Sequence, residues 1–406
     1  MEIGLAKRSC CSELPERQSL QSAAIPLQAL RSATMNVLAL VTDAFGGNGG
    51  IAQYNRDLVQ ALAACPGPNR IIVLPRLGEQ AGAALPSGTR QLKAHGSQLA
   101  YALAALRAAA NLGPFDFVYC GHLHLAPLAA LIGWMLGAPV WLQLHGWEAW
   151  QRPSRVGRLA AERAQLITAV SRFTRRRFLA VAGVDPARVR VLPNTIDARF
   201  FPGAKSASLL DRHGLTGKLV LLTVGRLDPD ERGKGHDKII GALPEILKAF
   251  PNVVYLIVGQ GEDRRRLQAL AASLGLADAV RFVDDVTADE LPQVYRSADL
   301  FVMPSLQEGF GIVFVEAAAS GLRVVGGNAD GSVDALADGA IGTAIDPADS
   351  AALVRAIQEG LGGRGPDPAQ ARRFAFENFA RHVGELVSRH LLRPAGDAAA
   401  ATVVPG

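Results

Sequence analysis

The chain has 406 residues and a formal net charge of +5, with 49% hydrophobic and 19% charged residues. This composition excludes an intrinsically disordered chain and predicts a soluble globular protein with a large core. At this length, two domains are a better expectation than one. The four cysteines (Cys10, Cys11, Cys65 and Cys120) have neither metal-ligand spacing nor a disulfide framework. We therefore expect reduced thiols in a cytoplasmic protein.

The two ends of the chain differ in composition from its body. Residues 1–34 show no sustained periodicity and lack the long apolar core of a secretory signal. Because Met35 directly precedes a clear first strand, we expect 1–34 to be a disordered tail or a mis-assigned start. The Ala- and Gly-rich residues 393–406 are expected to form a second disordered tail.

Between these ends, apolar runs alternate with helical patterns, which predicts a parallel α/β architecture. In the first half, strands are expected at residues 37–42, 71–74, 117–120, 140–144, 166–170 and 189–192. In the second half, they are expected at residues 219–224, 253–258, 280–283, 300–303 and 323–325. Helical patterns lie between them, for example at residues 53–64, 263–274 and 350–359.

One segment resembles a membrane span, because residues 120–147 contain no Lys, Arg, Asp or Glu. Glycines and prolines interrupt it, so a buried helix over 126–137 followed by a buried strand is the better interpretation. All four tryptophans fall within seventeen residues, from Trp134 to Trp150. We expect Trp134 and Trp141 to pack in the core, whereas Trp147 and Trp150, past the strand end, could stack on a sugar or a lipid.

Regular structure is interrupted near residues 196–216, before a new strand begins at Leu219. This break predicts an N-terminal domain over 35–200 and a C-terminal domain over 201–370. The expected fold class is α/β, with two doubly wound Rossmann-like parallel-sheet domains facing a central cleft.

Several first-half residues are expected at the edge of this cleft. The glycine loop Gly46–Gly50 follows the first strand, so Gly49 and Gly50 would allow close approach of a ligand. Its spacing differs from Gly-x-Gly-x-x-Gly, which makes a nicotinamide site a weak interpretation. His145 closes another strand, and Asn194 lies in a loop at the domain boundary.

In the second half, Arg226 ends the strand at 219–224, and Lys234 follows within a glycine-rich turn. The two cations could clamp a diphosphate. Asp284 and Asp285 do not form an Asp-x-Asp pair, and no His, Cys or Asp cluster has metal spacing. We therefore expect no cofactor and no metal, with phosphates neutralised by Arg, Lys and helix dipoles.

The segment from Glu308 to Glu316 follows the strand at 300–303 and reads as a glycine turn and then a helix. Free helix amides at a strand's carboxyl end attract phosphate, and two carboxylates accept hydrogen bonds from sugar hydroxyls. A nucleotide-sugar would satisfy both. The residues expected to line this substrate site are Glu308, Gly309, Phe310, Gly311, Ile312 and Glu316.

Taken in chain order, the motifs of this sequence resemble those of the retaining glycosyltransferases of group 1. This group is also called glycosyltransferase family 4 and has the GT-B fold. The matching pieces cover roughly residues 35–385. They are the Gly46–Gly50 loop, His145-Gly146-x-Glu148, Ser171-Arg172-Phe173-Thr174, Pro193-Asn194-Thr195-Ile196-Asp197, Gly225-Arg226-Leu227, Lys234-Gly235, Gly259-Gln260-Gly261 and Glu308–Glu316. One departure is Asn194-Thr195, where relatives often have Asn-Gly, and it puts only local turn geometry in doubt.

The resemblance implies roles for these residues. Glu316 would bind the donor ribose, Glu308 the hexose hydroxyls, and Arg226 with Lys234 the diphosphate. His145 would lie near the transferred sugar, and Gly49 or Gly50 near the phosphates or the acceptor. It also implies a C-terminal helix, within 371–392, that crosses back to the first domain.

The expected activity is retaining transfer of a hexose, with GDP-mannose or UDP-glucose as favoured donors, to a glycan or lipid-linked glycan in surface polysaccharide biosynthesis. A non-catalytic nucleotide-sugar-binding scaffold at the membrane is the alternative, and an epimerase or phosphorylase is a weaker one. Eight arginines and one acid between Arg152 and Arg177 suit phosphates or anionic lipid headgroups, and a solvated helix face is an equally good interpretation. The expected location is cytoplasmic, with peripheral contact at the inner face of the cell membrane left open, and no nucleic-acid partner is expected.

Overall fold

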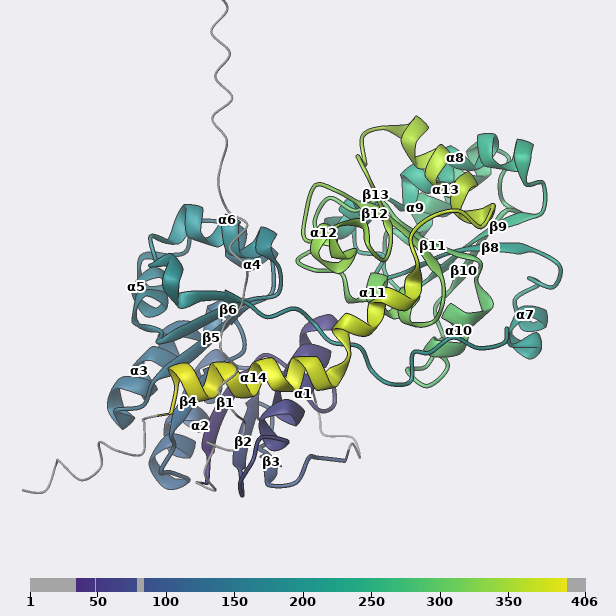
Figure 1. Ribbon diagram of the computed structural model, residues 1–406. Helices are drawn as coiled ribbons and strands as arrows, with labels where there is room; N and C mark the ends of the chain where they lie inside the picture. The colour runs from purple at the N-terminus through teal and green to yellow at the C-terminus, as the bar shows by residue number, and fades with distance from the viewer. Residues whose placement is uncertain (1–33, 48, 79–83, 393–406) are drawn as a thin grey trace, which may run out of the picture.

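The computed structural model describes residues 34–47, 49–78 and 84–392, which form two parallel α/β units joined by a linker (Figure 1). Each sheet has helices on both faces, as the sequence predicts. Residues 1–33 and 393–406 lie outside the described part of the chain, so the expectations for both tails and for Cys10 and Cys11 fall there. Cys65 and Cys120 are free thiols.

The N-terminal sheet has seven parallel strands in the order β3-β2-β1-β4-β5-β6-β7. Its strands are β1 (Asn36–Val41), β2 (Arg70–Pro75), β3 (Thr89–Gln91), β4 (Phe117–Cys120), β5 (Val140–Leu144), β6 (Leu166–Ala169) and β7 (Val189–Val191). The α-helices are α1 (Gly50–Ala63), α2 (Gln98–Asn111), α3 (Ala126–Leu136), α4 (Trp147–Trp150), α5 (Arg155–Arg163) and α6 (Arg172–Ala182), with short 3₁₀ turns at Leu123–Leu125 and Pro186–Arg188.

The C-terminal sheet has six parallel strands in the order β10-β9-β8-β11-β12-β13. Its strands are β8 (Leu219–Val224), β9 (Val253–Val258), β10 (Val280–Val283), β11 (Leu300–Met303), β12 (Arg323–Gly327) and β13 (Thr343–Ile345). The helices are α7 (Ala207–Arg212), α8 (His236–Ala249), α9 (Arg264–Ser273), α10 (Leu291–Ser297), α11 (Ile312–Ala319), α12 (Ser332–Ala335) and α13 (Ser350–Leu361), with 3₁₀ turns at Pro229–Lys234, Ala337–Gly339 and Pro368–Phe374.

The central strands are buried on both faces, which explains their nearly continuous apolar sequences. For example, every residue of β9 is buried. The short edge strands β3 and β13 have no such run, and the sequence did not predict them. Polar caps start several helices; the Ser171 side chain, for example, accepts a hydrogen bond from the backbone N–H of Thr174 at the start of α6.

The chain crosses between the units twice, side by side. After β7, Ile196 pairs with Ala375 in an isolated parallel bridge. The last helix, α14 (Phe376–His390), then runs across the N-terminal unit (yellow in Figure 1). It packs against α1, where the rings of Tyr54 and Phe379 meet edge to face with centroids 5.7 Å apart.

Two tryptophan predictions were wrong. Trp134 was expected in the core, but its side chain is 75% exposed because it lies on the outer face of α3. Trp150 was expected to be free to stack on a ligand, but it is buried and donates its indole N–H to Thr174. Trp141 is fully buried and Trp147 is exposed, as expected. No described helix has both the length and the apolarity that crossing a membrane requires.

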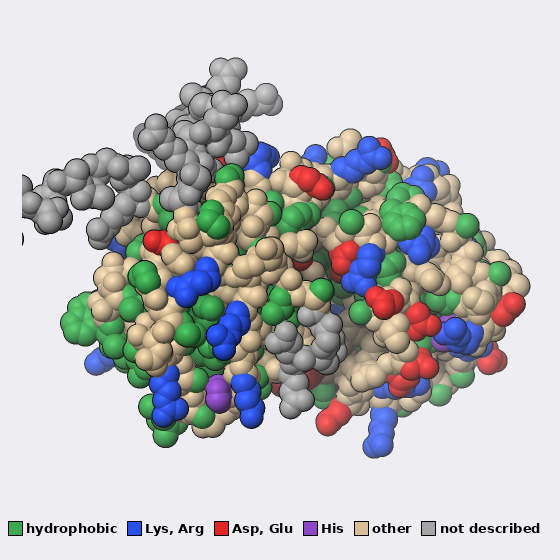
Figure 2. Space-filling view, turned by 90° about the horizontal axis from the view of Figure 1, so that it is seen from below, with side chains coloured by type: hydrophobic (Ala, Val, Ile, Leu, Met, Phe, Trp, Pro, Cys, Tyr) green, Lys and Arg blue, Asp and Glu red, His purple; other side chains and the backbone are tan. Residues whose placement is uncertain are grey.

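The two units carry opposite charge. Residues 35–200 contain 17 Lys and Arg against 8 Asp and Glu, whereas residues 201–370 contain 16 against 23. In the view of Figure 2, acidic side chains gather over the C-terminal unit on the right, while basic and apolar side chains dominate the N-terminal unit on the left.

Candidate active site

The turn between β11 and α11 carries Glu308, and a buried carboxylate holds this turn in place. Asp330 accepts hydrogen bonds from the backbone N–H of Glu308 (2.7 Å), from the hydroxyl of Ser305 (2.8 Å) and from the backbone N–H of Ser332 (2.9 Å). Gly331 donates its N–H to the carbonyl of Glu308 at 2.9 Å. The turn is therefore fixed by backbone contacts before any ligand binds.

The predicted cations meet on the carboxylate of Glu231, and Lys234 also reaches the side chain of Glu308. The ammonium of Lys234 lies 3.2 Å from a Glu308 oxygen and 2.7 Å from a Glu231 oxygen. The guanidinium of Arg226 pairs with the other Glu231 oxygen. Burial alone would lower the pKa of Lys234, but the charges of Glu308 and Glu231 outweigh it and raise that pKa. Lys234 is thus a fully charged, mostly buried cation beside Glu308.

Glu316 lies on the second turn of α11 and accepts a hydrogen bond from the hydroxyl of Tyr295 at 2.8 Å. Burial raises the pKa of Glu316 to about 7, and the neighbouring Asp197 raises it further, while Tyr295 and Arg199 act in the opposite direction. The side chain of Glu316 therefore gains or loses its negative charge near neutral pH.

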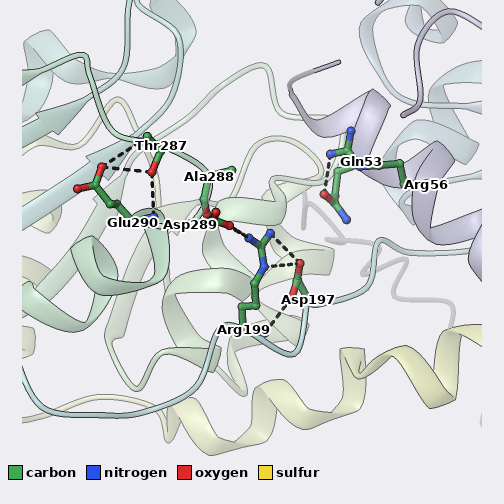
Figure 3. A network of polar contacts seen from close by, with 8 residues as sticks. All are labelled: Gln53, Arg56, Asp197, Arg199, Thr287, Ala288, Asp289 and Glu290. Carbon is green, nitrogen blue, oxygen red and sulfur yellow. Dashed lines mark hydrogen bonds and ion pairs between the residues drawn. The ribbon is translucent and has the colours of Figure 1, made fainter. Parts of the chain in front are cut away.

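The linker between the units contributes a polar network around Arg199 (Figure 3). Arg199 donates to Asp197 and, from the same guanidinium, to Asp289 at 2.9 Å and to the carbonyl of Ala288 at 3.3 Å. These contacts tie the linker to the loop before α10. The linker thereby holds Asp197 close enough to Glu316 to raise the pKa of that carboxyl.

The glycine loop before α1 is held by Arg56 of that helix, which donates to the carbonyls of Ala44 (2.8 Å) and Gly47 (2.7 Å). A Cβ at Gly47 would lie 1.6 Å from a carboxylate oxygen of Asp43, so any larger residue there would displace the Asp43 side chain. At Gly49 and Gly50, in contrast, an added Cβ would have no neighbour within 4 Å among the residues that the structure describes. These two glycines therefore keep the room that the sequence predicted for a ligand.

His145 lies directly after β5 and meets the Glu308 turn from the opposite unit. Its Nε2–H donates to the carbonyl of Gly121 at 2.9 Å, and its backbone N–H donates to Glu148 at 2.6 Å. Burial lowers the pKa of His145, so the neutral ring is favoured at neutral pH. A Cβ at Gly309 would lie 1.9 Å from the carbonyl oxygen of His145, which shows how closely the two sheet ends approach.

Four other predicted site residues are defined in the structure mainly by their packing or by their place in the backbone. The ring of Phe310 is buried and packs on Phe374 with centroids 5.6 Å apart, so only its backbone is available to a ligand. Asn194 is 8% exposed beside the crossing of the linker and the C-terminal segment, where Thr195 donates its hydroxyl to the carbonyl of Phe374. Gly311 has a positive φ of 85° and caps α11, and Ile312 begins that helix. The binding roles of all these residues stay predictions.

Sequence reasoning did not single out Asp330, Tyr295 or Glu231. Asp330 in Asp330-Gly331-Ser332 had a detectable signal, because an acid before Gly and Ser after a strand is typical of a turn that binds backbone amides. Tyr295 had none, since it reaches Glu316 from a separate helix. Among residues 34–392 as described, no group of three or more His, Cys, Asp or Glu is arranged to hold a metal, and metal independence stays a prediction.

Two family models match the chain, one on each unit. The model described as "Glycosyltransferase Family 4" matches residues 48–200, and "Glycosyl transferases group 1" matches residues 209–376. Together they cover the C-terminal sheet, the N-terminal sheet apart from β1, and every predicted site residue.

Two curated relatives show what the chain is similar to. A GDP-mannose-dependent alpha-(1-6)-phosphatidylinositol monomannoside mannosyltransferase of Mycolicibacterium smegmatis is 34% identical over 63% of this chain and 69% of its own length. A D-inositol 3-phosphate glycosyltransferase of Geodermatophilus obscurus is 37% identical over 55% of this chain, and the match spans about half (52%) of that relative.

Among solved structures, Anabaena Alr3699/HepE in complex with UDP and glucose superimposes with a TM-score of 0.71 over 87% of this chain and 100% of its own, at 22% identity. At that identity the likeness concerns the fold. The matched models and the mannosyltransferase relative carry the assignment further: the chain belongs to the glycosyltransferases of group 1, of the family 4 type, and has the GT-B fold.

Proposed function

We propose that this protein transfers a hexose from a nucleotide-diphosphate sugar to a hydroxyl acceptor with retention of the anomeric configuration. The observation that carries the proposal is the convergence of Lys234, Arg226 and Glu308 at the end of the donor-side sheet, directly opposite His145. Two cations beside a helix N-terminus suit a diphosphate, and the carboxylates of Glu308 and Glu316 suit sugar hydroxyls.

In this mechanism the bond between the anomeric carbon and the diphosphate breaks as the acceptor oxygen attacks the same face of the sugar. The leaving phosphate oxygen takes the proton of the acceptor hydroxyl. Lys234 and Arg226 stabilise the negative charge that develops on the diphosphate. For this to happen, both cations redirect from Glu231 to the phosphates, a movement that the flexible ends of their side chains allow.

GDP-mannose is the donor we propose first, because the mannosyltransferase relative is named for it. UDP-glucose is the second candidate. The acceptor we propose is a glycan or a lipid-linked glycan, as that relative's name also suggests. The biological process that we propose for this reaction is the biosynthesis of surface polysaccharides.

The test is a panel of nucleotide-sugars measured by thermal shift and by release of nucleotide diphosphate, with and without EDTA. We expect one donor to stabilise the protein and to be hydrolysed slowly, with the same rate in EDTA. A protein that binds a nucleotide-sugar but never turns it over, with any acceptor glycan supplied, would instead be the non-catalytic scaffold. Binding of none would contradict both.

We also propose that the outer flank of the N-terminal unit contacts an anionic membrane. Helices α3 and α5 pack side by side there. Between them they expose Leu131 (45%), Trp134 (75%), Met135 (53%), Val156 (61%) and Leu159 (53%). Exposed arginines of the 152–163 stretch border these apolar side chains, and this combination fits the headgroup region of anionic lipids.

Flotation with phosphatidylglycerol-containing vesicles tests this surface. We expect the wild type to float at low salt, Trp134→Ala to float weakly, and Leu274→Ala, which changes an exposed apolar residue of the other unit, to behave as the wild type. Failure of the wild type to float at low salt would contradict the proposal.

A further inference from the structure

The start of α6 in the N-terminal unit contacts the Glu308–Gly309 turn of the other unit directly. The hydroxyl of Ser171 donates to the carbonyl of Gly309 at 2.6 Å, and the hydroxyl of Thr174 lies 3.3 Å from the same oxygen. Ser171 and Thr174 are fully buried. The donor-side turn is therefore held from its own unit by Asp330 and from the opposite unit by α6.

Arg172, between these two hydroxyls, forms the charged part of the contact. Its Nε lies 2.7 Å from Asp334 and its Nη2 lies 2.5 Å from Asp338, while its backbone N–H also donates to Asp334 at 3.2 Å. Of the eight arginines between Arg152 and Arg177, this one faces the acidic C-terminal unit. The sequence placed Arg172 in the basic patch expected to face a membrane. In the structure its side chain instead pairs with Asp334 and Asp338 of the other unit.

The loop that supplies Asp338 is strained. Ala337 and Asp338 have φ values of 51° and 55°, and they are the non-glycine residues with positive φ in the described part of the chain. Such conformations are costly and persist where surrounding contacts hold them. Here the strained loop extends a carboxylate to the guanidinium of Arg172.

We propose that Ser171 and Arg172 form a latch between the two units, in which Arg172 is a positioning residue that seats His145 against the Glu308–Gly309 turn for glycosyl transfer. The proposal rests on the proposed function and adds the regulation of that site. Closure of this contact would exclude water from the donor and complete the site only when the two units meet. Opening would leave the Lys234, Arg226 and Glu316 side intact, because those residues make no contact with the latch among the interactions described.

The primary experiment compares Arg172→Ala with Arg176→Ala. Arg176 lies on the same helix but packs over the ring of Phe173 within its own unit, so it controls for the lost charge. Because the ion pairs are partly exposed, we expect Arg172→Ala to lower kcat roughly three- to tenfold. We expect affinity for the nucleotide diphosphate alone to stay close to that of the wild type, and hydrolysis of donor relative to transfer to rise. Arg172→Lys should recover part of kcat.

Asp338→Asn separates charge from backbone strain, because Asn also tolerates positive φ. Combined with Arg172→Ala, it should add little to the single change, as expected for partners. A second test is Gly309→Ala: the added Cβ would collide with the carbonyl of His145 in the opposite unit, so it should hold the units apart and increase the radius of gyration in small-angle scattering.

The outcomes separate the latch from the function it serves. If the wild type transfers sugar, and Arg172→Ala matches Arg176→Ala in kcat, hydrolysis and radius of gyration, the latch is overturned. If the wild type releases no nucleotide from any donor, the proposed function fails. A larger radius of gyration in Arg172→Ala than in Arg176→Ala would still support the latch in that case, and equal radii would overturn it.

Discussion

The two units meet through similar sheet ends but are built differently there. On the C-terminal side, charged groups are paired and anchored: Asp330 holds the turn, and Glu231 lies between Arg226 and Lys234. On the N-terminal side, the positions expected to face the ligand are glycines and a neutral histidine, and most of the excess arginines lie on outer helices. The comparison teaches that the C-terminal unit, the proposed donor side, is preorganised for charge, whereas the N-terminal unit, the proposed acceptor side, provides space.

The largest effect expected from this contrast is at Lys234. Lys234→Ala removes the buried cation that would stabilise the departing diphosphate, so kcat should fall by about 10²–10³. Steady-state kinetics with the identified donor measure it. Lys218→Ala, a lysine elsewhere in the same unit, is the control and should keep wild-type turnover. Wild-type kcat in Lys234→Ala would place the charge stabilisation elsewhere.

The second prediction concerns Glu316 of the C-terminal unit and the pH dependence of donor binding. The Glu316 pKa of about 7 means that the carboxylate, the form that would accept hydrogen bonds from the ribose hydroxyls in the proposed site, is lost as the pH falls below 7. Glu316→Gln should raise the donor KM about 10- to 100-fold at pH 8, as expected for hydrogen bonds to a charged group.

Wild-type kcat/KM should also decline from pH 8 to pH 6, and the Gln variant should lose this dependence. Profiles measured with saturating acceptor decide the matter. An unchanged slope in the variant would assign the titration to another group.

The same contrast explains how much could be read from the sequence. The buried strands β1, β8 and β11 were predictable because parallel sheets demand continuous apolar runs, and residues after a strand fall at one edge. The positions of Glu308, Lys234 and His145 at the facing sheet ends could therefore be predicted, and their roles stay predictions. Trp134 was misplaced because an apolar helix of α3's composition does not reveal which of its faces is covered. Trp150 was misplaced because its position past the end of β5 does not reveal that α6 covers it. Arg172 and Asp338 meet across the domain interface, a contact that local sequence patterns do not encode.

Asp330 tests whether the donor side is truly preorganised. Asp330→Ala leaves the N–H groups of Glu308 and Ser332 without their acceptor, which should reduce the free energy of unfolding by about 1–3 kcal/mol. Because the Glu308 turn would loosen, kcat/KM should fall as well. Urea unfolding and kinetics give the two values. The exposed Asp346→Ala, in the same unit, is the comparison and should alter kcat/KM little. A loss of stability with unchanged kcat/KM would show that the turn organises itself on the ligand.

The smallest effect concerns the one strongly perturbed carboxyl on the acceptor side. Burial raises the pKa of Asp57 to about 7, with Asp197 and Glu316 adding to the shift, while Gln53 and Arg56 oppose it. A carboxyl whose pKa is higher in the folded state stabilises the fold most at low pH, and this contribution is lost as the pH rises from about 4 through 7. Asp57→Asn removes the cost of ionisation and should raise the free energy of unfolding by about 1–3 kcal/mol at pH 8, with little change at pH 5.

Thermal melts at pH 5 and pH 8 measure this difference, with the exposed Asp278→Asn as control. Equal gains for Asp57→Asn at both pH values would mean that packing, and not ionisation, is responsible. A gain confined to pH 8 would show that the acceptor-side unit, despite its excess of arginines, leaves this carboxyl poorly compensated. The nearest guanidinium, that of Arg56, is committed to the glycine-loop carbonyls and so is only partly available to neutralise it.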